Sequence, residues 1–414
     1  MKTKENIGQY CPALYKSVFI TANARDGRIN PCCVYEDWQP GHEDLKEKSK
    51  QIATPLHNSI LLKDDRMTVA EGKIPKGCRW CVKEEAKSKG HYSYRRDMIE
   101  KWGEVPDEWI NTDGSVSDLA VEKLDIRLGN VCNLMCQFCG GHNSHLIAKE
   151  AGEKQILRRV VDNPDIFDSI IDGIKRYENL KEINFAGGEP LFMKKELLII
   201  LDKLKHKRKK EMAVKFISNA TIYDREILEK LEPFKKIVFD FSVDATGRSL
   251  EIARWGSSWK DTQMVMTQYL RWQDTINQRG KKINCSLVPT LSVFTILDCP
   301  QLFEWMTEMQ LETECVTFME QPSEQQINML PVDVLQELKQ KLLDNTRINR
   351  SLINFNDVIV GIDEAIKNND VSRETIDKFW KWNSYAEEKR NYKLQEELPE
   401  LYSKLKKLLL FFSQ

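Results

Sequence analysis

The sequence predicts an α/β protein whose central region contains parallel strands. Between residues 120 and 320, short runs rich in β-branched and aromatic residues alternate with longer segments whose apolar residues recur at helical spacing. This alternation occurs six times along the chain. A repeated strand-then-helix order implies that successive strands lie parallel and are joined by right-handed crossovers.

The first four expected strands end in, or are followed directly by, glycine, serine or asparagine. The six expected strands cover residues 124–128, 182–186, 214–219, 237–242, 283–291 and 315–318. The expected helices between them cover residues 166–174, 197–204, 227–231, 264–270 and 302–306. Enzymes built from parallel strands place their sites at the carboxyl ends of those strands. We therefore expect the working end of this protein where these polar residues gather.

Three cysteines follow the first expected strand closely, in the pattern CxxxCxxC: Cys132, Cys136 and Cys139. Three thiolates on one short loop can hold three irons of a [4Fe–4S] cluster, and the fourth iron then has no protein ligand. Because ordinary electron-transfer clusters take four cysteines, the missing thiolate indicates chemistry at the open iron. Two alternatives use the same residues. One is a structural zinc site, although zinc prefers four ligands in paired spacings, and the other is burial as small apolar side chains.

The second expected strand is followed by Gly187-Gly188-Glu189-Pro190. A residue without Cβ allows the backbone to approach a ligand closely. The cysteine pattern followed by this GGEP sequence resembles the radical S-adenosylmethionine (radical SAM) superfamily, over roughly residues 120–320. The resemblance implies that SAM binds the open iron, that the glycines approach its methionyl part and that Glu189 receives its ammonium group. It also implies a place beside the cofactor for Phe138, within the cysteine loop.

The resemblance assigns further SAM contacts to the ends of later strands. Ser218 and Asn219 resemble the part of the family that contacts the ribose. Ser242 and Asp244 resemble polar residues that contact the ribose or carboxylate, or that face the substrate. Arg254 is expected to pair with the SAM carboxylate through its planar guanidinium group. Ser and Asn at strand ends are also common turn formers, so each position has a structural alternative.

A second group of cysteines precedes the expected strands. Asp26-Gly27 predicts a hairpin turn that returns the chain toward its start. The order of Cys-Pro, Asp-Gly, Pro-Cys and CxxC sequences resembles the auxiliary-cluster module of SPASM and twitch radical SAM enzymes, although in most relatives this module follows the barrel. The resemblance implies a second [4Fe–4S] cluster with four thiolates. A zinc knuckle would use the same ligands, and Cys33 is an alternative to Cys32. The four expected ligands are Cys11, Cys32, Cys78 and Cys81.

The family resemblance narrows the fold class to an α/β protein with a partial (β/α)6 TIM-type barrel. It divides the chain into an N-terminal, SPASM/twitch-like iron–sulfur domain at residues 1–115, a radical SAM barrel at 116–325 and a C-terminal helical extension at 326–414. Leucines recur near helical spacing in the extension, which indicates packing. Residues 408–412 are expected to dock on the body or on a second subunit.

The composition excludes several classes of function. The 62 Lys and Arg residues are balanced by 63 Asp and Glu residues, so no overall field would recruit nucleic acid. No stretch is long and apolar enough to span a bilayer, and no secretory signal is recognised at the N-terminus. Eleven cysteines without a secretion signal favour thiol chemistry in a reducing, cytoplasmic compartment. The oligomeric state is not predicted.

The sequence therefore predicts a metal-binding radical SAM oxidoreductase, with flavodoxin or ferredoxin as its reductant. The resemblance implies reductive cleavage of SAM to a 5′-deoxyadenosyl radical, which abstracts hydrogen from a small-molecule or peptide substrate with the aid of the auxiliary cluster. Two residues are candidates for substrate chemistry: Cys315, as a thiol in the barrel lumen or simply a small buried side chain, and Glu320, as a substrate contact. Alternative functions are an iron–sulfur electron carrier or redox sensor, and a zinc-stabilised scaffold.

Overall fold

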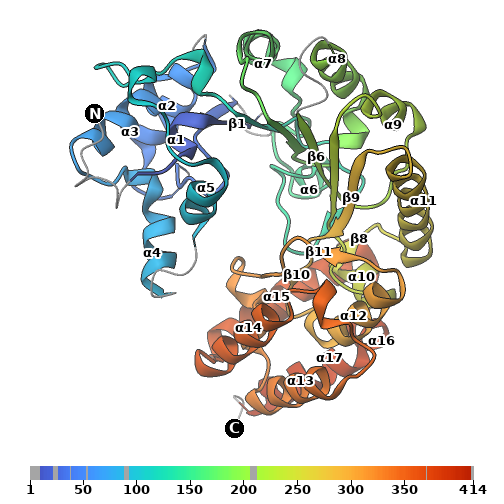
Figure 1. Ribbon diagram of the computed structural model, residues 1–414. Coiled ribbons are helices and arrows are strands. Elements are labelled where there is room, and N and C mark those ends of the chain that lie inside the picture. The colour runs from blue at the N-terminus through green and yellow to red at the C-terminus, as the bar shows by residue number, and fades with distance from the viewer. Residues whose placement is uncertain are drawn as a thin grey trace. The chain divides into compact units, whose positions relative to one another are not determined.

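The computed structural model describes residues 10–21, 27–37, 39–52, 55–87, 93–205, 212–369 and 371–411. The chain forms two compact units, which are described one after the other. The first takes in residues 1–132, 154–216 and 224–237, and the second takes in residues 133–153, 217–223 and 238–414. Figure 1 labels their helices and strands, which give a mixed α/β architecture with largely parallel strands.

The first unit is built on strands in the order β2-β1-β3-β5-β6. Strands β1, β3, β5 and β6 are parallel, and β2 pairs antiparallel with β1 at the edge. The first three predicted strands correspond to β3, β5 and β6. The bounds are β1 (Ser17–Thr21), β2 (Arg28–Asn30), β3 (Lys123–Arg127), β5 (Glu182–Ala186) and β6 (Ala213–Ser218).

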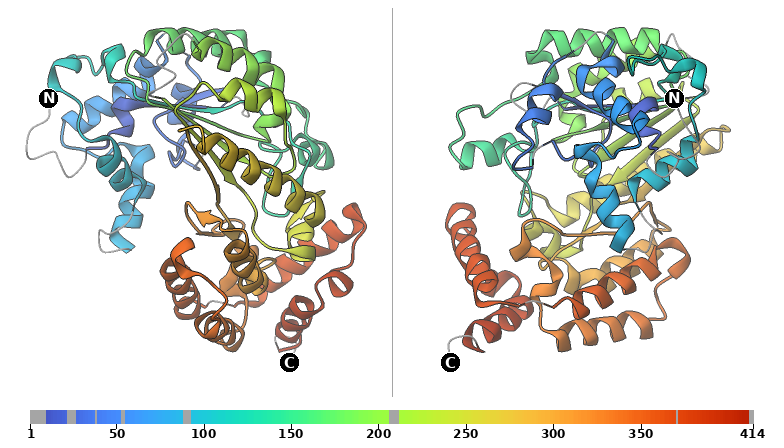
Figure 2. Two further views of the ribbon diagram at one scale, coloured as in Figure 1. Left: turned by 45° about the vertical axis from the view of Figure 1, so that its right-hand side comes forward. Right: turned by 90° about the vertical axis from the view of Figure 1, so that its left-hand side faces the viewer.

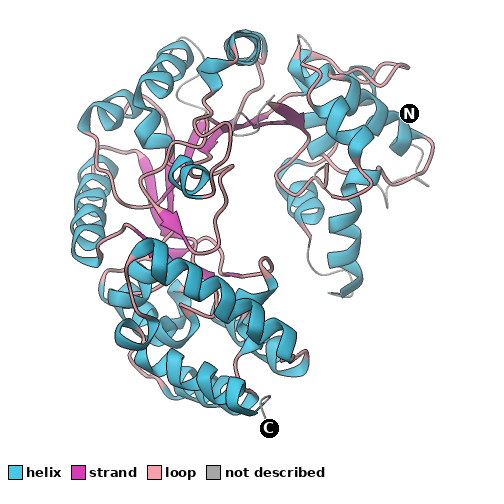
Figure 3. Cartoon of the chain, turned by 180° about the vertical axis from the view of Figure 1, so that it is seen from behind, coloured by secondary structure: helices cyan, strands magenta, loops and turns pink. Residues whose placement is uncertain are grey.

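The two faces of these strands differ in composition because successive side chains point to opposite faces. On one face, two rows in register across β1, β3, β5 and β6 contain only apolar side chains, none of which is exposed. Each such side chain contributes about 1.5–3 kcal/mol relative to exposure. Figures 1 and 3 show α7 (Pro164–Arg176), α8 (Lys194–Leu204) and α9 (Arg225–Leu231) along one side of these strands. The rows are Val18, Leu124, Ile183, Val214 and Ile20, Ile126, Phe185, Phe216.

Strand β1 was not predicted from the sequence. Its residues 17–21 pair in parallel with β3, and Ser17 is in register with Lys123. Pairing between segments so far apart leaves no local signal, and residues 17–21 lie within the region assigned to the cysteine-rich domain. The turn predicted at Asp26-Gly27 falls between β1 and β2, but Asp26 lies outside the described residues.

Helices α1 to α5 lie around β1 and enclose a core of their own. Leu14, Tyr15, Leu61 and Met98 are buried together in this core. Four of the five helices are short segments between β2 and β3 in the sequence. Their bounds are α1 (Ala13–Lys16), α2 (Glu43–Ser49), α3 (Ile60–Ala70), α4 (Arg79–Lys87) and α5 (Tyr94–Trp102).

The second unit contains the neighbouring strands β7 (Lys236–Phe241), β9 (Lys282–Leu287) and β11 (Glu312–Thr313). The predicted strands at 237–242 and 283–291 correspond to β7 and to β9 with β10 (Thr290–Leu291). The sixth predicted strand, at 315–318, is wrong in its extent. Strand β11 pairs with β9, β12 (Thr317–Phe318) pairs with β10, and Cys315 lies in the break. Pro289, which has no N–H to donate, separates β9 from β10 and interrupts the ladder.

Helices make up most of the second unit. Residues 332–411, in orange and red in Figure 2, form five helices one after another. No helix in the described part of the chain is long and apolar enough to cross a membrane. The helices are α6 (His145–Glu150), α10 (Gly247–Ala253), α11 (Trp259–Asn277), α12 (Cys299–Glu308), α13 (Val332–Asp344), α14 (Phe355–Lys367), α15 (Arg373–Arg390), α16 (Leu394–Glu397) and α17 (Pro399–Phe411).

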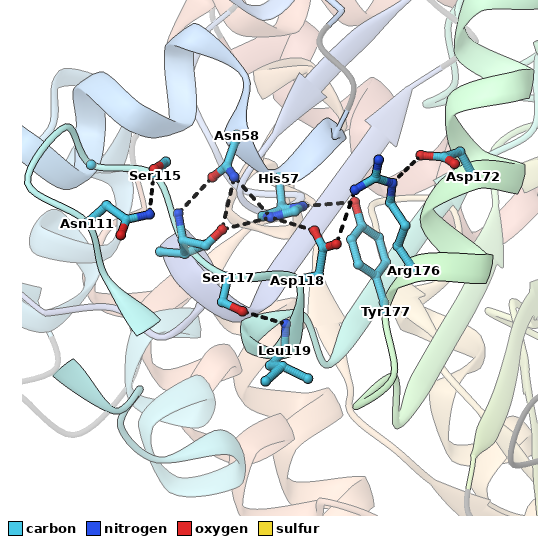
Figure 4. A network of polar contacts seen from close by, with 12 residues as sticks. His57, Asn58, Asn111, Ser115, Ser117, Asp118, Leu119, Asp172, Arg176 and Tyr177 are labelled. Carbon is cyan, nitrogen blue, oxygen red and sulfur yellow. Dashed lines mark hydrogen bonds and ion pairs between the residues drawn. The ribbon is translucent and has the colours of Figure 1, made fainter. Parts of the chain in front are cut away.

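Buried His57 connects the N-terminal helices of the first unit to the end of α7 (Figure 4). Its Nε2 donates to the Val116 carbonyl oxygen at 3.0 Å, and its Nδ1 accepts from the Tyr177 hydroxyl at 3.1 Å. Asp118 lies 3.4 Å from Nε2 and 3.2 Å from Nη1 of Arg176. Burial lowers the pKa of His57 to about 4, so the ring is neutral at pH 7.

We expect the contribution of His57 to stability to decline as the pH falls from about 6.5 toward 4. In this window the unfolded side chain binds a proton and the folded one does not. Lowering the pKa from 6.5 to about 4 corresponds to a loss on the order of 3 kcal/mol. The measurement is the free energy of unfolding in urea against pH. His57→Gln should be less stable at pH 7 and show a flatter profile between pH 6.5 and 4. Equally steep profiles would contradict the expectation.

Candidate active site and cluster sites

In the first unit, the segment that leads to Cys132 is bound to the turn after β5. The amide of Gly188 donates to the carbonyl oxygen of Gly129 at 2.8 Å, and the amide of Glu189 donates to that of Val131 at 2.7 Å. Cys132, the residue after Val131, is buried. The predicted SAM turn and the first cysteine of the CxxxCxxC pattern are therefore held next to each other before any cofactor is considered.

Gly187 and Gly188 are both required by this close contact. Gly187 has a φ of +117°, which residues with a Cβ rarely adopt, and a Cβ there would lie 2.7 Å from the carbonyl oxygen of Gly129. A Cβ on Gly188 would lie 2.8 Å from the carbonyl carbons of Asn130 and Val131. The glycines thus allow contact with the chain's own backbone. Contact between this turn and SAM stays a prediction.

Glu189 is completely buried and begins the next short helix. Its carboxylate accepts from the amide of Leu191 at 3.1 Å, which caps the 3₁₀ turn Pro190–Met193. Pro190 occupies the first position of this turn, where the missing N–H costs nothing. The GGEP sequence therefore forms a rigid connection between β5 and α8.

In the second unit, the other two thiols lie on and after β4 (Met135–Cys136). This strand pairs antiparallel with β8 (Arg254–Trp255), which places Cys136 opposite Arg254. The amide of Gln137 donates to the carbonyl of Ala253 at 2.8 Å, and that of Cys139 donates to the carbonyl of Cys136 at 3.1 Å. Cys136 is buried and Cys139 is half-buried. The loop is thus fixed by backbone hydrogen bonds on both sides of Cys136.

Arg254 faces Cys136 and is held by Asp244. The Asp244 carboxylate, which is fully buried, accepts from Nε of Arg254 at 2.6 Å and from Nη2 at 2.9 Å. Nη1 lies 3.9 Å from Sγ of Cys136, and the guanidinium carbon lies 5.5 Å from the ring centroid of Phe138. Burial raises the pKa of Cys136, and the charge of Arg254 opposes this. A positive charge here favours the thiolate, the form that binds iron.

Arg254 and Asp244, which are both predicted to contact SAM, thus lie together and pair with each other. The fork of Arg254 is engaged by Asp244, so its pairing with a SAM carboxylate stays a prediction. Asp244 also accepts from the amide of Thr290 at 2.8 Å. The predicted contact of Phe138 with SAM also stays a prediction, and its ring lies against Arg254.

The ends of β6 and β7 contribute polar residues within the second unit. Nδ2 of Asn219 donates to Oδ1 of Asn133 at 2.9 Å, and Asn133 follows Cys132 directly. The amide of Ser242 donates to the carbonyl of Ser218 at 2.8 Å, so these two strand ends lie side by side. Ser218 is buried and Ser242 is half-buried. The structure brings these residues near the cysteine loop, and their contacts with SAM stay predictions.

The C-terminal helices hold the cysteine loop through Arg390, a residue that sequence reasoning missed. Arg390, at the end of α15, is buried, and its Nη1 donates to the carbonyl of Met135 at 2.9 Å and to Oε1 of Gln137 at 2.5 Å. Its Nη2 lies 3.1 Å from the carboxylate of Glu150. Met135 and Gln137 flank Cys136, so one guanidinium group binds the backbone on one side of this thiol and a side chain on the other.

Two more side chains reinforce this connection. Nε2 of Gln325 donates to the carbonyl of Gln137 at 3.0 Å. The ring of Tyr392 lies 5.3 Å from that of Trp255 on β8. None of these residues carries a sequence signal, because an arginine near the end of a charged helix is ordinarily a surface residue. Only the tertiary fold brings α15 to the cysteine loop.

In the first unit, Cys11, Cys32, Cys78 and Cys81 line one cavity. Three of them are buried and Cys78 is half-buried. Most of the other lining residues are apolar, and Arg95 is the exception. Among the described residues, no three His, Cys, Asp or Glu side chains are arranged to hold one metal ion.

The electrostatics of this cavity favour a bound metal centre over free thiolates. Burial raises the pKa of Cys11 to about 12 and raises the pKa of the other three thiols as well. A thiolate forms in such surroundings when a metal supplies the compensating charge. Arg95 adds to this by lowering the pKa of Cys11 and Cys81, and its guanidinium is oriented by Glu85. The donor set therefore fits a four-cysteine iron–sulfur centre.

The remaining candidates lie apart from these groups. Cys33 is exposed and is not among the residues that line the cavity, whereas Cys32 is. Cys315 is half-buried between β11 and β12, so it does not begin a strand as predicted. Glu320 is exposed, and its carbonyl accepts from Nε2 of Gln326 at 2.5 Å. Nothing in their surroundings assigns chemistry to Cys315 or Glu320.

A comparison with protein families matches residues 126–269 to the radical SAM superfamily. No curated protein matches the sequence. Among solved structures, the native anSMEcpe structure with bound AdoMet is similar over 57% of this chain and 65% of its own, with 14% identity and a TM-score of 0.41. The anSMEcpe structure with AdoMet and the Kp18Cys peptide has a TM-score of 0.39 at the same identity, over 57% of this chain and 64% of its own.

A third similar structure is Streptococcus suis SuiB bound to S-adenosylmethionine. It is 14% identical, with a TM-score of 0.31, over 54% of this chain and 44% of its own. The chain therefore spans less than two thirds of the length of each of these three structures.

We expect Arg390→Gln to loosen the cysteine loop. Removing one partner of a buried ion pair costs about 3–5 kcal/mol, and here the loss would fall on the backbone beside Cys136. Arg390→Lys should rescue this only in part, because lysine cannot hold both sides of the loop with a planar fork. The measurements are the unfolding temperature and the iron bound after anaerobic reconstitution. Lys389→Gln, at an exposed neighbouring position, is the control. Equal iron content in Arg390→Gln and the control would contradict this role.

Proposed function

We propose that this chain, whose residues 126–269 match the radical SAM superfamily, is an enzyme that cleaves SAM reductively and uses the resulting 5′-deoxyadenosyl radical to remove hydrogen from a substrate. The observation that carries the proposal is the pairing of the GGE turn with the segment that ends in Cys132. A protein that only carries electrons has no need of a turn that binds SAM. Cys132, Cys136 and Cys139 would hold a [4Fe–4S] cluster whose fourth iron is left to SAM.

When bound, the cluster supplies the single electron that breaks the sulfonium bond of SAM. The chain's own residues bind, orient and shield the reactants. Arg254 lowers the cost of a thiolate at Cys136, and Arg390 binds the Met135 carbonyl and the Gln137 side chain on either side of it. Asn219 fixes Asn133, and the two backbone hydrogen bonds to Gly129 and Val131 fix the other end of the loop. A preorganised loop reduces the reorganisation that cofactor binding requires.

We assign the second cluster to Cys11, Cys32, Cys78 and Cys81. Their shared cavity and their raised pKa values support a four-cysteine metal centre. The family resemblance favours an iron–sulfur cluster, and a zinc knuckle is the alternative with the same ligands. Its place in the chain before the radical SAM region, in a SPASM/twitch-like domain at residues 1–115, is part of the proposal. The barrel at residues 116–325 and the helical extension at 326–414 are also part of the proposal.

The reaction needs an external electron donor, for which flavodoxin or ferredoxin is suited. The substrate is proposed to be a small molecule or a freestanding peptide, and the compartment to be the cytoplasm.

We expect the reconstituted protein to release 5′-deoxyadenosine when incubated anaerobically with SAM and dithionite. Replacing Cys132, Cys136 and Cys139 by Ala should abolish this release, because no iron would remain to bind SAM. Cys285→Ala, at a buried cysteine outside both sets, is the control and should retain activity. The products are measured by liquid chromatography and mass spectrometry. Undiminished release from the triple variant would contradict the assignment of these thiols.

We also expect about eight irons per chain after anaerobic reconstitution, since two [4Fe–4S] clusters need twice the iron of one. Cys78→Ala/Cys81→Ala should lower the content to about four and reduce the stability of residues 10–115, as in other small metal-dependent domains. Iron and zinc are measured by mass spectrometry of the metals. About four irons in both proteins would mean that the N-terminal thiols hold no cluster, and one zinc lost on mutation would identify a zinc knuckle.

A further inference from the structure

The second face of the first-unit strands carries a row of polar side chains that the proposed cofactor sites do not use. The row takes in Asp125, Asn184 and Lys215, which are in register on β3, β5 and β6, and Asn30 on β2, which Phe19 of β1 separates from Asp125. We call Asn30, Asp125, Asn184 and Lys215 the polar row. Asn30, Asp125 and Asn184 are 4%, 5% and 4% exposed, so their polar atoms are almost completely removed from water.

Several oxygens of the polar row have no hydrogen-bond donor among the described residues. These are Oδ1 of Asp125, Oδ1 of Asn184 and Oδ1 of Asn30. Asp125 and Asn184 are already joined to each other, because Nδ2 of Asn184 donates to Oδ2 of Asp125 at 3.0 Å. A buried acceptor left unpaired costs about 1–3 kcal/mol. Neighbouring strands lie about 4.8 Å apart. A bound group with several N–H or O–H donors would satisfy two such oxygens on neighbouring strands.

The charges around the Asp125–Asn184 pair identify what is missing. Nε of Arg127 lies 3.6 Å from Oδ1 of Asp125, beyond hydrogen-bond distance. Nζ of Lys123 lies 3.1 Å from Glu182 and is engaged there. The unpaired atoms of the polar row are all acceptors. A carboxylate or phosphate would bring only further acceptors. A primary ammonium group instead brings three donors and a charge opposite to that of Asp125.

We propose that Asp125 and Asn184 recognise a primary amine of the substrate, an inference that rests on the proposed function. The position of the pair suits this role. Asp125 and Asn184 lie two residues before the ends of β3 and β5, at Arg127 and Ala186. This corresponds to about 7 Å along the strands. Gly187 follows Ala186 directly, so a molecule anchored on the pair would extend toward the turn assigned to SAM.

A purely structural role would leave this pair indifferent to added ligands. Polar pairs between buried strands are also found with ordered water as the third partner. Such a pair would show no preference for amines. The two roles therefore differ in what binds, and the difference can be measured at equilibrium.

The test uses ligand-observed NMR titrations of the reconstituted protein with three probes: butylamine, butan-1-ol and butyltrimethylammonium. The three share one carbon chain. Butylamine has charge and donors, the alcohol has one donor without charge, and the quaternary ammonium has charge without donors. We expect butylamine to bind at least tenfold more tightly than either of the others, which corresponds to about 1.4 kcal/mol.

Asp125→Asn keeps the shape of the side chain and removes its charge, and it should weaken butylamine binding at least tenfold. Asn184→Ser is a second variant, which keeps the test possible if Asp125→Asn does not fold. It should weaken butylamine binding as well. Asp172→Asn is the matched control, because Asp172 is a half-buried carboxylate on α7 paired with Arg176, away from the polar row, and binding should be unchanged. Equal affinity for the three probes, no binding of butylamine, or equal weakening in the control would overturn the proposal.

The test separates this proposal from the proposed function because the titrations need no cleavage of SAM. If butylamine binds as expected and 5′-deoxyadenosine is not released, the amine site stands and the radical SAM activity fails. If 5′-deoxyadenosine is released and the probes bind equally, the activity stands and the amine site fails.

Discussion

The alternation of side chains along β1, β3, β5 and β6 is the constraint on which the rest of the first unit depends. One face of these strands presents two rows of apolar side chains that are fully buried, and the other presents charged and polar side chains. A slip of one residue in the register would exchange the two faces, so the apolar rows fix the register of every strand. Through this register they also fix where the strands end, and with it the position of the GGE turn beside Cys132.

The cysteine loop that begins beside this turn is held at several points of the chain. Gly188 and Glu189 bind its start, Asn219 binds Asn133, and Arg390 binds the Met135 carbonyl and the Gln137 side chain. Through Arg390, the helices at the C-terminus acquire a structural role at the site. A loop fixed in this way presents its thiols without the entropy loss that a mobile loop would incur on binding a cluster.

The sequence predicted local features well and contacts between distant segments poorly. Five of the six strands were predicted within about one to four residues, because their alternating or apolar runs are bounded by polar residues. The sixth was misplaced because Pro289 ends one ladder and a second, separate pairing begins at Thr290. Strand β1 and Arg390 were missed because their partners, β3 and Met135, are defined only by the tertiary fold. The role predicted for Arg254 illustrates the same limit, since its pairing with Asp244 has no signature in the sequence.

The central claim is that the loop 132–139 supplies only three thiolates, so that one iron is open to the amine and carboxylate of SAM. Electron–nuclear double resonance on the reduced, reconstituted protein tests this directly, with SAM that carries ¹⁵N in its amine or ¹⁷O in its carboxylate. The account predicts a hyperfine coupling from each label that is lost when Cys132, Cys136 and Cys139 are replaced by Ala. Spectra without coupling from either label, at SAM concentrations that saturate the protein, would contradict it.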